Sequence, residues 1–189
     1  MRKTDARIRY TQSVLKQVLL SFLKEKPINR ITVKEVCERA ELNRATFYAH
    51  YSDCFALLES IEEDLLEAFQ QSLMLVDSFD VTALIEAIYT MIERQQEACR
   101  VLIFQNVCPN VLRRMISLAR GESIAYWKQH LRHITEAELE MLYTHLSNGL
   151  MHVVVEGYEK YSREEVVRFV NRIVQCSLWQ ASCCCSIIV

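Results

Sequence analysis

The amino-acid sequence predicts an all-α protein with two domains. Only three Gly and two Pro occur among its 189 residues, and this scarcity of turn formers favours long helices over a many-stranded sheet. Hydrophobic residues make up 51% of the chain and charged residues 24%, which is typical of a globular protein. Apolar residues also recur every three to four positions along several segments, as they do on the buried face of a helix.

The charges divide the chain into two parts at Tyr51. Residues 1–51 contain 11 Lys or Arg against 5 Asp or Glu, a net charge of +6, whereas residues 52–189 contain 11 against 19, a net charge of −8. A basic N-terminal part beside an acidic remainder indicates a polyanionic partner for the first part only. We therefore expect two domains, a basic one in residues 1–51 that binds a polyanion such as DNA and a helical one in residues 52–189.

A first helix is expected from about Asp5 to Lys24, because an apolar stripe of helical spacing runs along this segment and can cover the helices that follow. Four basic residues precede or begin this helix, namely Arg2, Lys3, Arg7 and Arg9. Such an arm can follow a phosphate backbone or enter a minor groove, and a solvated tail is the equal alternative.

A second helix is expected over about Val33–Ala40. Thr32 stands before an apolar-periodic run with Glu35 three residues on, so the two side chains can satisfy free backbone N–H groups as a capping box. Ile31 and Val36 have the spacing of the hydrophobic staple that accompanies such a box. The sequence thus predicts where this helix begins.

A third helix is expected from Arg44 to about Tyr51, with Asn43 as its N-cap, and it completes a helix-turn-helix. At about 100° per residue, Phe47 and Tyr51 face inward and leave small and polar side chains outside. Those side chains suit a helix in a DNA major groove, and an ordinary surface helix is the alternative. The candidate DNA-binding residues are Thr32, Lys34, Asn43, Arg44, Ala45, Thr46, Tyr48, His50 and Tyr51.

The most specific part of this stretch is the pattern Thr-Phe-Tyr-x-His-Tyr, within the run TVKEVCERAELNRATFYAHY that SDCFALLESI follows. Over residues 8–61 the chain resembles TetR/AcrR-type bacterial repressors, whose N-terminal domain has three helices. Two positions depart from the family pattern. Glu41 stands where the turn usually has Gly, at a cost of up to about 1 kcal/mol if its backbone is left-handed. Cys54 stands where the family often has a basic residue that touches phosphate.

A long fourth helix is expected from a cap at Ser52 to about Met74, with Phe55 near its inner face, and it links the two domains. Residues 77–80 break the apolar pattern. Pro109 suits the first turn of a later helix, where its missing N–H does no harm. The helical segments expected after the break are 81–96, 99–104 and 109–130.

Two capping-box pairs, Thr135 with Glu138 and Ser162 with Glu165, precede the last two helices. The apolar surface of these helices is wider than one neighbouring face needs, which indicates a four-helix bundle built by two subunits. The TetR resemblance implies the same homodimer. The expected interface residues are Leu142, Leu146, Gly149, Leu150, Val153, Gly157, Val170, Ile173, Val174 and Ser177.

The interior of the second domain is expected to hold aromatic and sulfur-containing side chains, in the region where the resemblance places the family's ligand pockets. Few polar groups among them would suit a moderately apolar ligand rather than a phosphate or a carboxylate. For any one of these residues, a plain core role is the stronger interpretation. The candidate ligand-binding residues are Tyr89, Cys99, Phe104, Met115, Trp127 and His145.

No metal and no cofactor is expected. His130 lies three residues before His133, and His152 lies four before Glu156, but the sequence lacks the Glu-x-x-His pairs of di-iron bundles. It also lacks a phosphate-binding loop, a nucleophile elbow and a Cys-x-x-Cys pair, so an enzyme has little support. The run Cys183–Cys185 is interpreted as a frayed terminus, with redox sensing as the alternative.

No segment approaches the roughly 18 consecutive apolar residues that a membrane span needs, so we expect a cytoplasmic protein without membrane contact. The resemblance implies a homodimeric repressor that binds an inverted-repeat operator in double-stranded DNA and is released by a small-molecule effector. One alternative is a regulator of the same fold whose C-terminal domain binds a protein partner. The other is a helical scaffold or enzyme without specific DNA binding.

Overall fold

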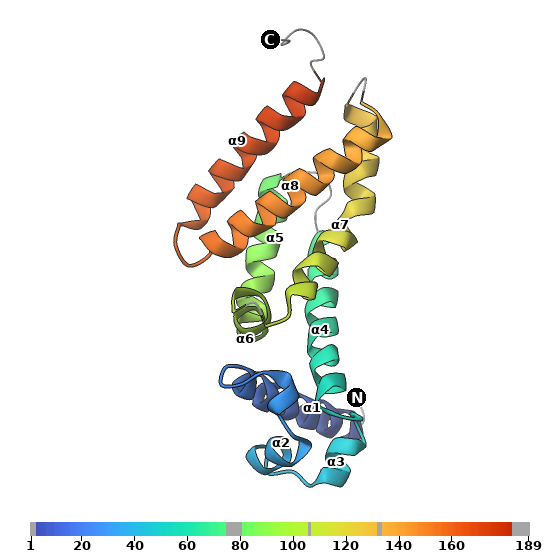
Figure 1. Ribbon diagram of the computed structural model, residues 1–189, viewed down its shortest axis with the longest axis vertical. Coiled ribbons are helices and arrows are strands. Elements are labelled where there is room, and N and C mark those ends of the chain that lie inside the picture. The colour runs from blue at the N-terminus through green and yellow to red at the C-terminus, as the bar shows by residue number, and fades with distance from the viewer. Residues whose placement is uncertain (1–2, 75–80, 106, 132–133, 183–189) are drawn as a thin grey trace. The chain divides into compact units, whose positions relative to one another are not determined.

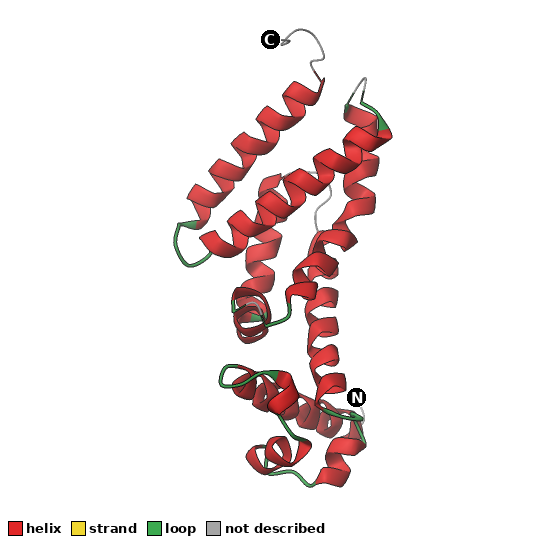
Figure 2. Cartoon of the chain, in the orientation of Figure 1, coloured by secondary structure: helices red, strands yellow, loops and turns green. Residues whose placement is uncertain are grey.

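The computed structural model describes residues 3–74, 81–105, 107–131 and 134–182, and within these ranges the chain is helical with no strand (Figures 1 and 2). The all-α prediction is confirmed. The elements are α1 (Lys3–Leu23), the 3-10 turn η1 (Ile28–Arg30), α2 (Val33–Arg39), α3 (Arg44–Tyr48), α4 (Cys54–Met74), α5 (Val81–Arg94), α6 (Gln96–Cys99), the π-helical turn η2 (Arg100–Phe104), α7 (Pro109–His130), α8 (Glu136–Gly157) and α9 (Arg163–Ser182).

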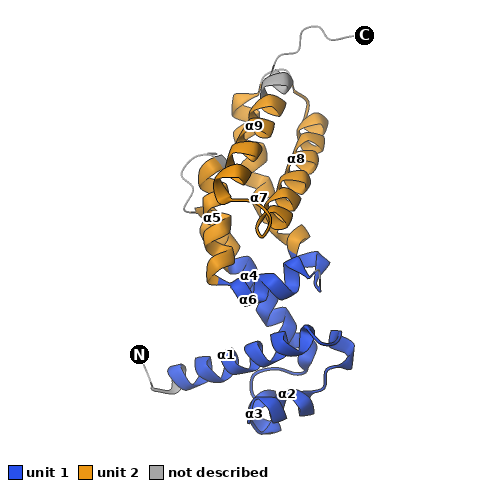
Figure 3. Cartoon of the chain, turned by 90° about the vertical axis from the view of Figure 1, so that its left-hand side faces the viewer, with its two compact units in different colours: residues 1–67, 95–111 blue, residues 68–94, 112–189 orange. Residues whose placement is uncertain are grey.

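The chain folds into two compact units (Figure 3). Unit 1 comprises Met1–Glu67 and Gln95–Val111, and unit 2 comprises Ala68–Arg94 and Leu112–Val189. The boundary expected after Tyr51 differs from this division, which falls inside α4. The reason is that the first part of α4 buries its apolar side chains in unit 1, so the change of charge after residue 51 does not mark the edge of the packing.

The core of unit 1 joins α1 to the helix-turn-helix and to the first part of α4. Lys16 of α1 donates to the Asp64 carboxylate at 2.5 Å and to the Ser60 carbonyl at 3.3 Å, and both acceptors belong to α4. Lys24 near the end of α1 pairs with Glu97 of α6. The side chains without solvent exposure in this core include Leu15, Leu19, Val36, Phe47 and Leu57.

Unit 2 contains the end of α4 with α5, α7, α8 and α9. Arg163, the first residue of α9, binds the Glu86 carboxylate of α5 at 2.7 Å. Further along α9, the Asn171 amide donates to Thr82 of α5 at 2.7 Å. These two contacts hold α9 against α5. A separate buried cluster joins α7 to α8, and it consists of Trp127, Leu131, Leu139, Tyr143 and Leu146.

The predicted capping boxes are present. Thr32 Oγ1 accepts from the Glu35 N–H at 3.3 Å while the Glu35 carboxylate accepts from the Thr32 N–H at 2.9 Å, and the pairs before α8 and α9 have the same geometry. Hydrogen bonds from Lys26 and Thr32 lower the pKa of Glu35 to about 2, so the box is charged at neutral pH. The cap of α4 differs from the expected Ser52, because Asp53 accepts from the Ala56 N–H at 2.8 Å.

Two helices are shorter than expected. The α3 helix ends at Tyr48 rather than near Tyr51, since the N–H groups of His50 and Tyr51 both bond to the Phe47 carbonyl and close the last turn. The segment expected over 81–96 ends at Arg94, and α6 and η2 follow it. Over the ranges that the structure describes, no helix is both long enough and apolar enough to cross a membrane.

Candidate DNA interface and ligand cavity

The turn between α2 and α3 contains a left-handed residue at the position where the family pattern usually has Gly. Glu41 has φ of 54° and is the one non-glycine residue with positive φ in the described chain. The Leu42 N–H bonds to the Cys37 carbonyl at 3.0 Å, and the Glu41 N–H lies 3.4 Å from the Glu38 carbonyl. This pair of bonds is the Schellman motif, whose left-handed position usually holds glycine.

The second helix of the motif is held by its cap and by one buried ring. Asn43 Oδ1 accepts from the Thr46 N–H at 2.7 Å and from the Thr46 hydroxyl at 2.9 Å. Phe47 is fully buried, and its ring meets the Tyr48 ring edge-on at a centroid distance of 5.7 Å. The start and the rotation of α3 are therefore fixed, and Arg44 and Tyr48 face solvent, with Tyr48 57% exposed.

Most of the candidate DNA-binding residues are accessible in unit 1. Tyr51 differs, because it is only 8% exposed and its ring packs on Phe47 at 6.0 Å between centroids. The Tyr51 hydroxyl is also buried, without a hydrogen-bond partner among the described residues. We therefore regard Tyr51 as a core residue. The exposed candidates are Thr32, Lys34, Asn43, Arg44, Ala45 and Tyr48, and the half-buried ones are Thr46 and His50.

The start of α4 departs from the expectation in two ways. Cys54 is 4% exposed, and burial raises the pKa of its thiol to about 11, so this position offers neither a positive charge nor an accessible group to phosphate. Phe55, expected on the inner face, is 57% exposed instead. Because the cap is Asp53, α4 begins later and its apolar stripe is Cys54, Leu57, Leu58 and Ile61. This exposed phenylalanine was missed by periodicity alone.

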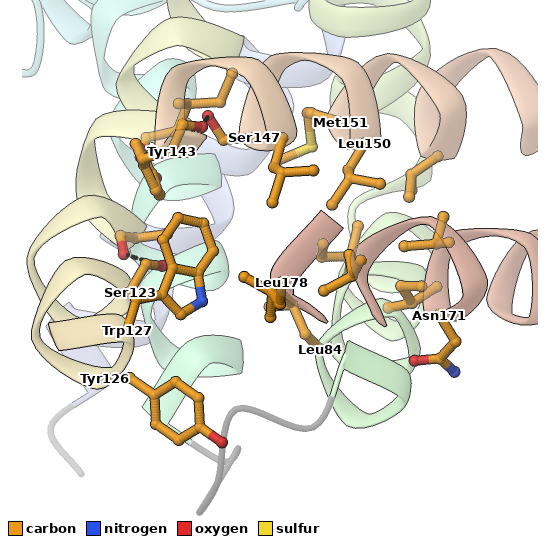
Figure 4. Close-up of a pocket in the computed structure, with 18 of the residues that line it drawn as sticks. Leu84, Ser123, Tyr126, Trp127, Tyr143, Ser147, Leu150, Met151, Asn171 and Leu178 are labelled. Carbon is orange, nitrogen blue, oxygen red and sulfur yellow. Dashed lines mark hydrogen bonds between the residues drawn. The ribbon is translucent and has the colours of Figure 1, made fainter. Parts of the chain in front are cut away.

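Unit 2 has a partly open cavity of about 290 Å³ between α4, α5, α7, α8 and α9 (Figure 4). Of the six candidate ligand-binding residues, Trp127 lines it. Tyr89 and Met115 are buried in unit 2 away from this lining, and Cys99 and Phe104 belong to unit 1. His145 is exposed on α8. The polar lining residues that the sequence reasoning missed are Ser123, Tyr126, Tyr143, Ser147, Asn171 and Gln175.

The candidate interface residues of α8 and α9 divide between two faces. Leu146, Val170 and Val174 are buried inside the chain and line the cavity, as the half-buried Leu150 does. Gly157 is also buried, and a Cβ there would lie 3.1 Å from Val166. Outside this packing, Gly149 and Ile173 are exposed, and Leu142, Val153 and Ser177 are half-buried.

Two of the described histidines bond within their own helices. His130 Nδ1 lies 2.8 Å from the Tyr126 carbonyl and His152 Nδ1 lies 2.9 Å from the Asn148 carbonyl, both within one helical turn. Within the four described ranges, no group of three His, Cys, Asp or Glu side chains could hold a metal ion. His133 and the run Cys183–Cys185 lie outside the described residues.

The sequence comparison points to a regulator over a limited stretch. No protein-family model matches the chain. A stretch of 62 residues is 36% identical to a Bacillus subtilis protein described as an uncharacterised HTH-type transcriptional regulator, YxbF. The match covers 33% of this chain and only 16% of that protein, so the chain spans about a sixth of its relative's length.

Three solved structures are similar over nearly the whole chain. A TetR transcriptional regulator from Streptococcus agalactiae has a TM-score of 0.66 at 21% identity, covering 90% of this chain and 97% of that one. A proposed transcriptional regulator from Pseudomonas aeruginosa also has a TM-score of 0.66, at 14% identity, with 96% and 95% covered. The dihydroxyacetone kinase operon activator DhaS has a TM-score of 0.57 at 12% identity, with 92% and 98% covered.

The chain therefore has the fold of transcriptional regulators of known structure, and its helix-turn-helix stretch is similar in sequence to part of an HTH-type transcriptional regulator. More narrowly, the chain has the fold of the TetR regulators, so the resemblance stated for residues 8–61 is confirmed and extends in fold to the C-terminal helices.

Proposed function

We propose that the protein is a homodimeric repressor that binds an inverted-repeat operator and is released by a small molecule held in unit 2. The observation that carries the DNA-binding part is the capped α3 helix, which turns Phe47 inward and leaves Arg44 and Tyr48 exposed. A guanidinium and a phenol on one helix can reach phosphates and base edges in a major groove. A repressor acts on chromosomal DNA, which supports a cytoplasmic location.

The exposed side of α8 and α9 supports the proposed dimer. Gly149 lies in the middle of α8, where glycine costs about 1 kcal/mol relative to alanine, and a Cβ there would meet no atom within 4 Å. Packing within the chain therefore gives no reason for this glycine, whereas a second copy approaching closely would. Apolar side chains also remain exposed on these two helices, namely Met141, Phe169 and Ile173.

A two-fold dimer presents α3 twice, so its operator should be an inverted repeat. The effector needs to prefer the DNA-incompetent state by only a few kcal/mol to shift the population. The activator DhaS has a similar fold, so the sign of regulation requires its own test. A reporter gene behind the operator decides it, since a repressor lowers expression and an activator raises it. A partner protein in place of the small molecule would appear as capture of that protein without any ligand effect.

DNA binding is tested by single substitutions on α3. Tyr48→Ala and Arg44→Ala should each weaken operator binding by about 1–3 kcal/mol in a gel shift at fixed salt. The thermal midpoint should hardly change, because both side chains are exposed. Tyr161→Ala and Arg113→Ala are matched controls, since both residues are exposed and belong to unit 2. Equal losses in the controls would remove the assignment of α3 as the reading helix.

The dimer is tested by Gly149→Leu, which places a bulky side chain on the exposed middle of α8. Separating two close-packed backbones would remove contacts over much of the interface. Sedimentation equilibrium should then show monomers at concentrations where the parent protein is dimeric. An unchanged dimer would place the interface elsewhere.

A further inference from the structure

The cavity in unit 2 has no charged group on its described wall. Its lining side chains come from α4, α5, α7, α8 and α9 and include no carboxylate, ammonium, guanidinium or imidazole. Burial raises the pKa of Tyr143 to about 12, so this phenol is neutral at physiological pH. The volume of the cavity, about 290 Å³, is close to the lower limit of ligand pockets.

Three hydroxyls on the wall already donate their protons to backbone carbonyls. Ser123 donates to the Ala119 carbonyl at 2.7 Å, Ser147 donates to the Tyr143 carbonyl at 2.6 Å, and Tyr143 donates to the Ile116 carbonyl. A hydroxyl has one proton and two lone pairs. The three oxygens can therefore offer only acceptor lone pairs to a bound molecule.

Trp127 supplies a donor that the protein leaves unused. Its ring is buried and packs on Tyr143 at a centroid distance of 5.9 Å. Figure 4 shows the indole nitrogen on the side of the ring that faces the open centre of the cavity, across from Leu178. No hydrogen bond from this N–H to another described residue is present, and the indole has no acceptor role of its own. The nitrogen is also not among the fully buried unpaired side-chain atoms of the described residues, so it is open to the cavity.

We propose that the ligand of this cavity is an uncharged, mainly apolar molecule with a hydrogen-bond acceptor that binds the Trp127 N–H. This inference rests on the proposed effector function and adds the ligand's chemistry. An ion in the cavity would lose its hydration without gaining a counter-charge, which disfavours both carboxylates and ammonium ions. A hydrocarbon would fill the space but leave the indole N–H unpaired.

The first experiment compares four molecules that share a phenyl ring and ten carbon atoms in all. Benzylacetone is neutral with an acceptor, butylbenzene is neutral without one, and phenylbutyrate and phenylbutylammonium carry opposite charges. Binding to the full chain is measured by titration calorimetry and by thermal shift, without DNA. Benzylacetone should bind at least about tenfold more tightly than either ion. The affinity of butylbenzene should lie between that of benzylacetone and those of the two ions.

The second experiment removes the donor. Trp127→Phe keeps an aromatic ring in the wall, and it should weaken benzylacetone binding by about 2- to 10-fold, the worth of one hydrogen bond. Butylbenzene affinity should hardly change, because it does not use the N–H. Tyr161→Phe is the matched control, since it removes one polar group from an exposed ring outside this cavity. The four-molecule comparison needs no variant, so it still decides if Trp127→Phe does not fold.

The inference is wrong if either ion binds as tightly as benzylacetone, or if none of the four molecules binds up to its solubility limit. It is also wrong if Trp127→Phe weakens the binding of benzylacetone and of butylbenzene equally. Its failure is distinguishable from failure of the proposed function. Neutral binding without release from DNA supports the cavity chemistry and refutes the effector role. Release from DNA by an ion alone supports the effector role and refutes the cavity chemistry.

Discussion

Replacing Glu41 with glycine should stabilise the protein. The residue has φ of 54°, a left-handed conformation that costs an L-residue about 1–2 kcal/mol and glycine almost nothing. Glycine also gives the unfolded chain more freedom, which offsets about 0.4–1 kcal/mol of that gain. The net stabilisation should be about 0.5–1 kcal/mol. For a chain of this length, that raises the thermal midpoint by about 1–4 °C.

Glu38→Gly, three residues away, is the control that shows whether the effect of Glu41→Gly comes from the backbone conformation. Glu38 lies in the last turn of α2 and is exposed, and its carboxylate lies 3.7 Å from Lys34 one turn earlier. Glu38→Gly is the same chemical change at a right-handed position, where glycine costs about 1 kcal/mol and the lost pair adds a few tenths. The two variants should therefore move the midpoint in opposite directions.

Urea unfolding followed by circular dichroism measures both variants, with Glu41→Ala as a third chain that keeps the left-handed strain without the carboxylate. Glu41→Ala should remain close to the parent protein. If Glu41→Gly is destabilising to the same degree as Glu38→Gly, the turn carries no backbone strain. If Glu41→Ala gains as much as Glu41→Gly, the gain comes from removing the charge and not from relieving φ.

Two further predictions concern the caps and glycines. The pKa of Glu35 is about 2 in the folded chain, below its ordinary value of 4.5, so its stabilising effect is complete above pH 4.5 and is lost as pH falls towards 2. Glu35→Gln should flatten this acid-side decline in urea titrations, and an unchanged slope would show that other carboxylates cause it. Gly157→Ala should lower the midpoint, since its Cβ would press on a buried valine at 3.1 Å, whereas Gly149→Ala should raise the stability of the monomer. If Gly157→Ala and Gly149→Ala shift the thermal midpoint equally, the difference in burial between the two glycines does not control their effect on stability.

The helix-turn-helix could be predicted from the sequence because the interactions that define it are short-range. Thr32 with Glu35 and Asn43 with Thr46 are bonds between residues three apart, so residue spacing alone reveals them. The left-handed backbone at Glu41 was indicated only by the family resemblance, which usually has Gly at this turn position. The α4 cap was assigned one residue early, because Ser52 and Asp53 are both good caps and the sequence does not distinguish them.

The cavity could not be predicted, since its wall is made by residues distant along the chain. Tyr143 bonds to Ile116, 27 residues away, and Asn171 bonds to Thr82, 89 residues away. Hydrophobic periodicity shows that α8 and α9 have apolar faces but not which face meets α5 and α7. Leu146 and Val174 were therefore assigned to a subunit interface, whereas the structure places both in the wall of the cavity. His145 was expected inside for the same reason.

Unit 1 is assembled from two separate stretches, Met1–Glu67 and Gln95–Val111. During synthesis, its first stretch leaves the ribosome before the second exists, and residues 68–111, 44 in number, must follow before every native partner is available. At about 5–20 residues per second, this delay is about 2–9 s. For that time the Lys24 side chain lacks its partner Glu97. The nascent helix-turn-helix thus belongs to a unit whose last segment is translated after the next unit has begun.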